Sequence, residues 1–297
     1  MLLLEKLKLS YFTKTGAVPN KDCMNQKILV GIVAVALLGA VVWSAVQHRK
    51  GGFAGGGSPG TAVPVGQLLA EASKEEEAGN KLKAKEAYSQ IVSDYPDYDK
   101  IEEVQDKLGK LSIGIITSNE QTPQTVIHDV KPGDSLGKLA KQYNTTKELI
   151  KKSNGLKSDV IRVGQKLRVW TAPFNIFVDK SQNILLLKDG EEVVKAYHIS
   201  TGKDNITPVG SFKIAAKLEK PVWFKAGGPP IPSESPDNEL GSRWMGFDSD
   251  PHYGLHGTPH PESIGQQVTA GCVRLKNEDL EELFDILPTG TPVVIQN

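Results

Sequence analysis

Hydrophobic positions follow four different patterns along the 297 residues of this chain. An uncharged apolar run covers residues 28–46, and residues 67–111 place apolar side chains at the spacing of a helix. Residues 125–170 mix strand-like alternation with two short helical patterns, and strand-like segments dominate from residue 172 onward. This succession predicts a multidomain chain, and the length suits about two folded domains.

The apolar run at residues 28–46 is long enough to cross the hydrocarbon core of a bilayer as a helix. Trp43 suits the membrane interface, residues 1–27 carry five lysines, and the stretch after Lys50 is rich in glycine and uncharged. We therefore expect a single-pass transmembrane signal anchor in the cell membrane, with residues 1–27 in the cytoplasm and the C-terminal domains outside it. A cleaved signal is the alternative, because small residues follow the run.

A helical segment is predicted at residues 67–111, where apolar side chains such as Ala87 and Ile91 recur on one helical face. Linkers are expected on both sides, over the Gly-rich residues 47–66 and over residues 112–124. The segment resembles one tetratricopeptide-type helical hairpin followed by a further helix, and a single such repeat buries little on its own. We interpret it as a spacer or as a surface for a protein partner.

Residues 125–170 predict a strand–helix–helix–strand unit. Asp134 follows a Lys-Pro-Gly turn and is expected to cap the first helix, Gly155 ends the second helix, and His128 is expected on the strand surface. The segment resembles a LysM domain, an α+β fold that binds N-acetylglucosamine-containing glycans. The resemblance places the glycan groove at Gly133, Asp134, Ser135, Asn154, Gly155, Leu156 and Ile161.

Short strands alternate with turns in the C-terminal part of the chain. Strands are predicted at residues 175–179, 184–188, 193–200, 212–217 and 292–296. A helix is predicted at residues 277–287, with early acidic residues that favour its dipole. Residues 172–297 thus predict a mostly-β domain with one helix, and the irregular stretch at residues 221–240 is either a lid over a substrate or a plain surface loop.

The candidate chemistry lies in residues 251–275, which hold Cys272, His256 and Arg274. A thiol attacks as the thiolate, and an imidazole can accept its proton. Backbone N–H groups at a glycine turn, here at Gly271, can stabilise an oxyanion. An arginine can bind a carboxylate through two parallel hydrogen bonds. These parts suit acyl transfer through a cysteine.

Two other interpretations of these residues stay open on composition alone. Cys272 could be an inert buried thiol, because free cysteines are often buried. His252, His256 and His260 could bind zinc together with Cys272. The prolines and glycines among the histidines oppose the helix that would align them on one face.

Several motifs occur here in a fixed order: STGK, TPVGSF, LGSRWMGF, YGLHGT, TAGCVRL and KNEDLEELFDILPTGTPVVIQ. Together they resemble the L,D-transpeptidase family, with its YkuD-type catalytic domain, over residues 172–297. The resemblance implies a β-sandwich-like fold and a reaction without metal or cofactor. One departure is Ala270, where many members carry a second histidine, and it leaves His256 as the candidate base.

The resemblance implies that Cys272 attacks the L,D-peptide bond after the third residue of a peptidoglycan stem, while His256 moves the proton. An amine of a second stem would resolve the thioester and form a 3–3 cross-link. Water as acceptor would make the protein an L,D-carboxypeptidase, a protein amine would couple a protein to the stem, and a non-catalytic peptidoglycan-binding scaffold is a further alternative. In the same resemblance, the Gly257 carbonyl orients His256, and the N–H groups of Gly271 and Cys272 hold the oxyanion. Arg274 binds a substrate carboxylate or orders the loop. The expected substrate contacts are Tyr253, Trp244 and Thr269.

The distribution of charge argues against nucleic acid as a partner, and the positions of the two cysteines bear on the state of Cys272. Basic and acidic residues both number 35, but residues 124–170 hold ten basic and four acidic residues, and residues 171–297 hold eleven and seventeen. Neither region has the basic stripe with interleaved aromatics that nucleic acid binding needs. The two cysteines, Cys23 and Cys272, lie on opposite sides of the predicted span, so we expect Cys272 to be a free thiol.

Overall fold

The computed structural model describes residues 63–225 and 227–297 of the chain. The predicted cytoplasmic tail and transmembrane span, at residues 1–46, lie outside the described residues. Within the described residues, no helix combines the length and the apolar character that a membrane crossing needs. From Val63 to Asn297 the chain forms one structural unit.

Three helices open this unit: α2 (Val65–Glu77), α3 (Lys81–Asp94) and α4 (Ile101–Ile116). Tyr88 of α3 and Leu68 of α2 are buried in a hydrophobic core that the three helices share. The apolar positions that recur at helical spacing in the sequence are therefore the ones that pack together.

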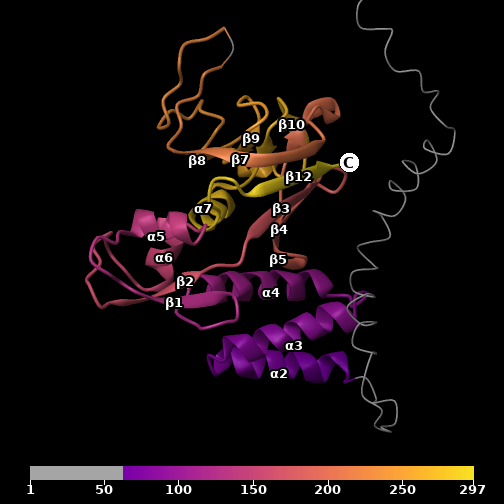
Figure 1. Cartoon of the computed structure of the whole chain (residues 1–297). Helices are drawn as coiled ribbons and strands as arrows, with labels where there is room; N and C mark the ends of the chain where they lie inside the picture. Colours follow the sequence, from indigo (N-terminus) through magenta and orange to yellow (C-terminus); the bar gives the residue numbers. More distant parts are fainter. Residues whose placement is uncertain (1–62, 226) are drawn as a thin grey trace, which may run out of the picture. The chain divides into compact units, whose positions relative to one another are not determined.

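Helix α4 contradicts two expectations. It continues five residues past the predicted boundary at residue 111, because Ile113, Ile115 and Ile116 are buried, and the following linker is correspondingly shorter. The helical segment is also not a spacer. Helix α4 lies along β5 (Glu192–His198) (Figure 1), and Ile113 and Ile116 belong to the hydrophobic core of the C-terminal domain.

The next elements are β1 (Thr125–Asp129), α5 (Leu136–Gln142), α6 (Lys147–Ser153) and β2 (Lys166–Trp170). Strands β1 and β2 pair antiparallel along their whole length. The predicted strand–helix–helix–strand unit is confirmed.

Two details of this unit differ from the prediction. Ser135, not Asp134, caps α5, since its hydroxyl accepts a hydrogen bond from the N–H of Lys138 at 3.3 Å. His128 is buried rather than on the surface. Its Nε2 donates to the Asp134 carboxylate at 3.0 Å, and its Nδ1 lies 2.9 Å from the Tyr143 hydroxyl. Alternation along a strand cannot reveal such a pair of polar partners.

Two joints fix this unit to its neighbours. Arg168 of β2 is 2% exposed and donates to the carbonyls of Ile116 at 2.7 Å and Glu120 at 2.6 Å, where it satisfies the C-terminal end of α4. Lys152 of α6 pairs with Asp285 of the C-terminal domain at 2.6 Å. The strand–helix–helix–strand unit is thus held by side chains on both sides.

The C-terminal domain is built on an eight-stranded sheet with the order β11-β9-β8-β7-β12-β3-β4-β5. The β9–β11 and β3–β12 pairs are parallel, and the other pairs are antiparallel. The remaining strands of this sheet are β3 (Phe174–Asp179), β4 (Ile184–Asp189), β7 (Gly210–Glu219), β8 (Arg243–Phe247), β9 (Gly254–His256), β11 (Val273–Arg274) and β12 (Pro292–Gln296). The mostly-β prediction is confirmed, although the strands form one continuous sheet beside a small parallel pair, β6 (Thr201–Gly202) and β10 (Gln267–Thr269).

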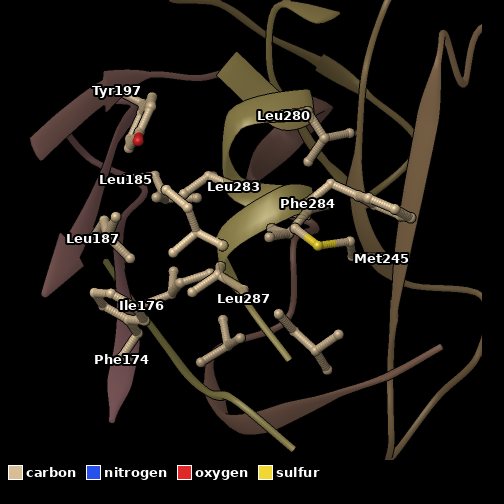
Figure 2. Close-up of a cluster of buried hydrophobic side chains, with 14 of the residues drawn as sticks. Phe174, Ile176, Leu185, Leu187, Tyr197, Met245, Leu280, Leu283, Phe284 and Leu287 are labelled. Atoms are coloured by element: carbon tan, nitrogen blue, oxygen red, sulfur yellow. The ribbon is translucent and has the colours of Figure 1, made fainter. Parts of the chain in front are cut away.

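Helix α7 (Asn277–Ile286) packs on this sheet. Figure 2 shows Leu283 pointing toward Leu185 of β4, and Phe284 beside Met245 of β8, in one buried cluster. Full burial of each such side chain stabilises the fold by about 1.5–3 kcal/mol. The helix therefore ties β4 near one edge of the sheet to β8 near the other, next to the strands β9 and β11.

Candidate active site

Strands β9 and β11 bring the predicted catalytic residues together. They run parallel, and Arg274 of β11 lies opposite His256 of β9. Cys272 comes directly before β11, two residues from Arg274. The charge of Arg274 lowers the pKa of both Cys272 and His256, which agrees with this placement.

His256 is 3% exposed, and the Trp244 ring stacks on it with centroids 6.2 Å apart. Its Nδ1 lies 2.6 Å from the carbonyl oxygen of Gly257. A carbonyl can only accept, so Nδ1 carries the proton and Nε2 keeps a lone pair that can take a proton. Burial, followed by the charge of Arg274, lowers the pKa of His256 to about 4, against the opposing effect of the Gly257 and Glu239 carbonyls.

Cys272 is a free, partly buried thiol whose Sγ donates to the carbonyl of His252 at 3.4 Å. Burial raises its pKa to about 11, although the main chain of Gly254 and the charge of Arg274 act in the opposite direction. Thiol and imidazole are therefore both neutral at pH 7 in the free protein.

The turn before Cys272 is held by Thr269. The Thr269 hydroxyl is buried, donates to the Cys272 carbonyl at 2.6 Å and accepts from the Gly271 N–H at 3.2 Å. Gly271 has φ +121°, and a Cβ there would overlap the Tyr253 ring. Thr269 thus shapes the turn before Cys272, and the Gly271 N–H that was predicted as an oxyanion donor is bonded to the Thr269 hydroxyl.

Asn277 is a residue that the sequence interpretation missed. Its Oδ1 accepts from the N–H groups of Ser242 and Thr258, both at 3.0 Å, and its Nδ2 donates to the Thr258 carbonyl at 2.9 Å. A Cβ on Gly257 would overlap the Asn277 amide. Asn277 therefore holds the turn whose Gly257 carbonyl orients His256. An asparagine at the first position of a helix is the one available signal, because such side chains often bond to nearby backbone.

Arg274 is 8% exposed and already paired. Its Nη1 donates to the Ser263 hydroxyl at 3.0 Å, and its Nη2 pairs with the Glu239 carboxylate. Of the two predicted roles, loop order is the one that these contacts support in the free protein. Glu239 was not singled out in the sequence, since it lies in the irregular stretch before β8.

The other two histidines of this region have separate partners. His252 is 88% exposed at its side chain and contacts Asp250 at 2.9 Å, while His260 lies 3.3 Å from Glu262. Across residues 63–225 and 227–297, no group of three potential ligands converges as a metal site would require. The arrangement that the zinc interpretation needs is not formed.

The predicted glycan-binding residues fall into two groups. Gly133 and Gly155 expose main chain at turns with positive φ. Asn154 instead uses its amide inside the fold, where it bonds the Ile150 carbonyl at 2.7 Å and both main-chain groups of Arg168 at 2.8 Å. Leu156 and Ile161 pack against the local hydrophobic core, and Asp134 and Ser135 have the local bonds described above.

Comparison with known proteins agrees with this geometry. Residues 173–295 match the L,D-transpeptidase catalytic domain, and residues 128–170 match the LysM domain. The putative L,D-transpeptidase YqjB of Bacillus subtilis is 40% identical over 125 residues, which cover 40% of this chain and 69% of that protein. The chain belongs to the L,D-transpeptidase family.

Further L,D-transpeptidases match over other shares of their length. The putative L,D-transpeptidase YkuD of Bacillus licheniformis is 34% identical over 178 residues, 57% of this chain and 98% of that protein. A solved L,D-transpeptidase from Mycobacterium smegmatis matches at 20% identity and a TM-score of 0.37, over 46% of this chain and 65% of that one, slightly under two thirds of its length. The LysM and L,D-transpeptidase domains together indicate that the protein binds peptidoglycan.

Proposed function

We propose that the protein is a peptidoglycan L,D-transpeptidase that forms 3–3 cross-links through a thioester on Cys272. The observation that supports the proposal is the pairing of β9 with β11, in which His256 lies opposite Arg274, two residues past Cys272, while the Nδ1 proton of His256 is committed to the Gly257 carbonyl. Nε2 is then the nitrogen that can accept the thiol proton.

In the first half-reaction, His256 Nε2 takes the proton of the Cys272 thiol as Sγ attacks the carbonyl of the L,D-peptide bond. The Cys272 N–H stabilises the oxyanion. The imidazolium returns the proton to the nitrogen of the leaving D-amino acid, the C–N bond breaks, and a thioester remains.

In the second half-reaction, an amine of a neighbouring stem attacks the thioester, and His256 takes a proton from that amine. The C–S bond breaks, a new amide links the two stems, and Cys272 recovers its proton from the imidazolium. The same chemistry with water as acceptor gives the carboxypeptidase alternative.

In this proposal, the LysM unit binds the glycan strands of peptidoglycan. Tethering raises the local concentration of stems at the cysteine without strengthening any single stem contact. The Arg168 and Lys152 joints favour a fixed distance between the glycan groove and the active site over a flexible tether.

An anchor at residues 28–46, with both folded domains outside the cell membrane, completes the proposal and rests on the apolar run and the lysines before it. A membrane-impermeant maleimide added to intact cells, with wall access verified, is expected to label Cys272 and to spare Cys23. Labelling of Cys23 alone would indicate the opposite orientation, with residues 1–27 outside the cell membrane and the folded domains in the cytoplasm.

The decisive experiment incubates the full chain, purified in mild detergent, with a disaccharide tetrapeptide and measures product masses beside the Cys272→Ala variant. Loss of D-alanine together with a cross-linked dimer, absent in the variant, would support transpeptidation. Tripeptide without dimer would indicate the carboxypeptidase, and no turnover by either protein would favour the non-catalytic scaffold.

A further inference from the structure

Glu239 lies where a substrate carboxylate would be expected. It belongs to the long connection between β7 and β8, the loop drawn in orange in Figure 1, and its carboxylate pairs with Nη2 of Arg274. The second oxygen of the same carboxylate lies 3.8 Å from His260 Nε2. An anion site made of Arg274 and His260 is thus occupied by a side chain of the protein itself.

Glu239 uses only part of what Arg274 offers. Nη1 of Arg274 bonds Ser263, Nη2 bonds Glu239, and Nε is buried without a hydrogen-bond partner in the described part of the chain. A guanidinium fork binds a free carboxylate best through two parallel hydrogen bonds. A carboxylate that is not tethered to the loop can adopt that arrangement, whereas Glu239 leaves one donor unsatisfied.

The loop keeps its conformation by other means. The neighbouring residue Asn238 is 2% exposed, and its Nδ2 donates to the carbonyls of Pro221 at 2.9 Å and Ile231 at 3.1 Å. These bonds join the two ends of the loop to each other. Exchange of the Glu239 carboxylate therefore does not require the loop to unfold.

The distance along β11 suits the terminal carboxylate of a donor stem. Arg274 lies two residues beyond Cys272, which allows a backbone distance of at most about 7 Å between them. In a tetrapeptide stem the free carboxylate belongs to the residue that leaves, one residue beyond the scissile carbonyl. A carbonyl at Cys272 and a carboxylate at Arg274 fit that spacing.

We propose that Glu239 is a specificity-determining residue that occupies the carboxylate subsite of the donor stem, and that a stem binds by exchanging its terminal carboxylate for Glu239 on Arg274. This inference rests on the proposed function, because it assumes a peptide stem as the ligand. Glu239 competes with the free terminal carboxylate of a stem for Arg274, whereas an amidated terminus has no charge to exchange for it. Glu239 therefore lowers the affinity for free-acid stems and sets how strongly the protein prefers them over amidated ones.

The test measures binding without turnover. Calorimetry on the full chain carrying Cys272→Ala uses two probes, a tetrapeptide stem with a free terminal carboxylate and the same stem as its C-terminal amide. Glu239→Gln keeps the shape and removes the charge. Glu262→Gln is the matched control, since Glu262 also faces His260, at 3.3 Å, but has no contact with Arg274 among the described residues.

Glu239→Gln is expected to bind the free-acid stem about tenfold more tightly, because the subsite no longer has a competing occupant, and to bind the amide unchanged. Glu262→Gln is expected to match the parent for both probes. Glu239→Asp is a second variant that keeps the negative charge on a shorter side chain, and its affinity for the free-acid stem is expected to increase less than that of Glu239→Gln.

Equal shifts for the two stems, or weaker binding of the free acid in Glu239→Gln, would overturn the proposal. Absence of binding by either stem in all variants would overturn it as well. The proposed function is judged separately, from turnover by the chain with Cys272 intact, so a failure of the Glu239 proposal leaves that result standing.

Discussion

Two buried histidines in two domains of this protein have opposite surroundings. His128 in the LysM unit has a side-chain partner at each ring nitrogen, Asp134 and Tyr143. The ring of His256 in the catalytic domain has no side-chain hydrogen-bond partner among the described residues: its Nδ1 lies 2.6 Å from the Gly257 carbonyl, and burial lowers its pKa to about 4. A buried histidine whose two ring nitrogens both have hydrogen-bond partners is typical of a structural residue. A buried histidine whose pKa is lowered, because burial disfavours the charged ring, is typical of a site that moves protons.

The largest expected effect separates the two histidines by activity. His256→Gln is expected to lower turnover of a stem substrate by about 10²–10⁴-fold, because the thiol proton loses its acceptor. His128→Gln is expected to keep the rate of cleavage of a soluble stem within about twofold, since His128 lies in the other domain. Steady-state kinetics with soluble tetrapeptide measure both. Equal losses in the two variants would contradict the distinction.

The next effect concerns pH. The pKa of His256 is lowered from 6.5 to about 4, so the unfolded chain binds this proton more readily than the folded one. The contribution of the neutral His256 ring to the free energy of unfolding is therefore fully present above pH 6.5. It is lost as the pH falls through about 4, and the loss amounts to about 3 kcal/mol.

Urea titrations between pH 7 and pH 4 measure this effect as the difference between the parent and His256→Gln. The free energy of unfolding is expected to fall less steeply in the variant. Parallel curves would mean that His256 is not buried as a neutral ring.

More of the fold than of the candidate active site could be predicted from the pattern of residues in the sequence. Strands β3, β4 and β12 were predicted, because strand-like alternation and turn signals mark them. Strands β9 and β11 have three and two residues and show no period, although they position His256 and Cys272. Family motifs, not periodicity, pointed to these residues.

What the sequence could not show is which polar groups satisfy one another. Asn277, Glu239 and Asp134 each bond residues that lie elsewhere in the fold or across a turn. The bond from Thr269 to the Cys272 carbonyl is local, yet the motif reads equally well as a substrate contact. Tertiary contacts decide these roles, and a single sequence does not record them.

A smaller effect tests the structural histidine. His128→Ala removes both bonds of the ring and leaves the Asp134 and Tyr143 groups without their partner. The free energy of unfolding is expected to fall by about 2 kcal/mol. His260→Ala, at a side chain that is 47% exposed, is the control and is expected to change stability by less than about 0.5 kcal/mol. Chemical denaturation followed by circular dichroism makes the comparison.

The smallest effect concerns the joint between the two domains. Lys152 is 51% exposed where it pairs with Asp285. Lys152→Ala is expected to lower the free energy of unfolding by about 0.5 kcal/mol, because exposed ion pairs contribute little. Arg168→Met should cost clearly more, since Arg168 is buried against the carbonyls at the end of α4. A larger loss for Lys152→Ala than for Arg168→Met would reverse our ranking of the joints.

Cys272 can be tested as the nucleophile of an acyl-transfer site by intact mass after incubation with a carbapenem, which the family resemblance implies as an acylating agent. We expect one added carbapenem per chain, located on Cys272 by peptide mapping and absent in Cys272→Ala. An adduct that persists in Cys272→Ala, or an unmodified chain that still turns over stem peptides, would contradict it.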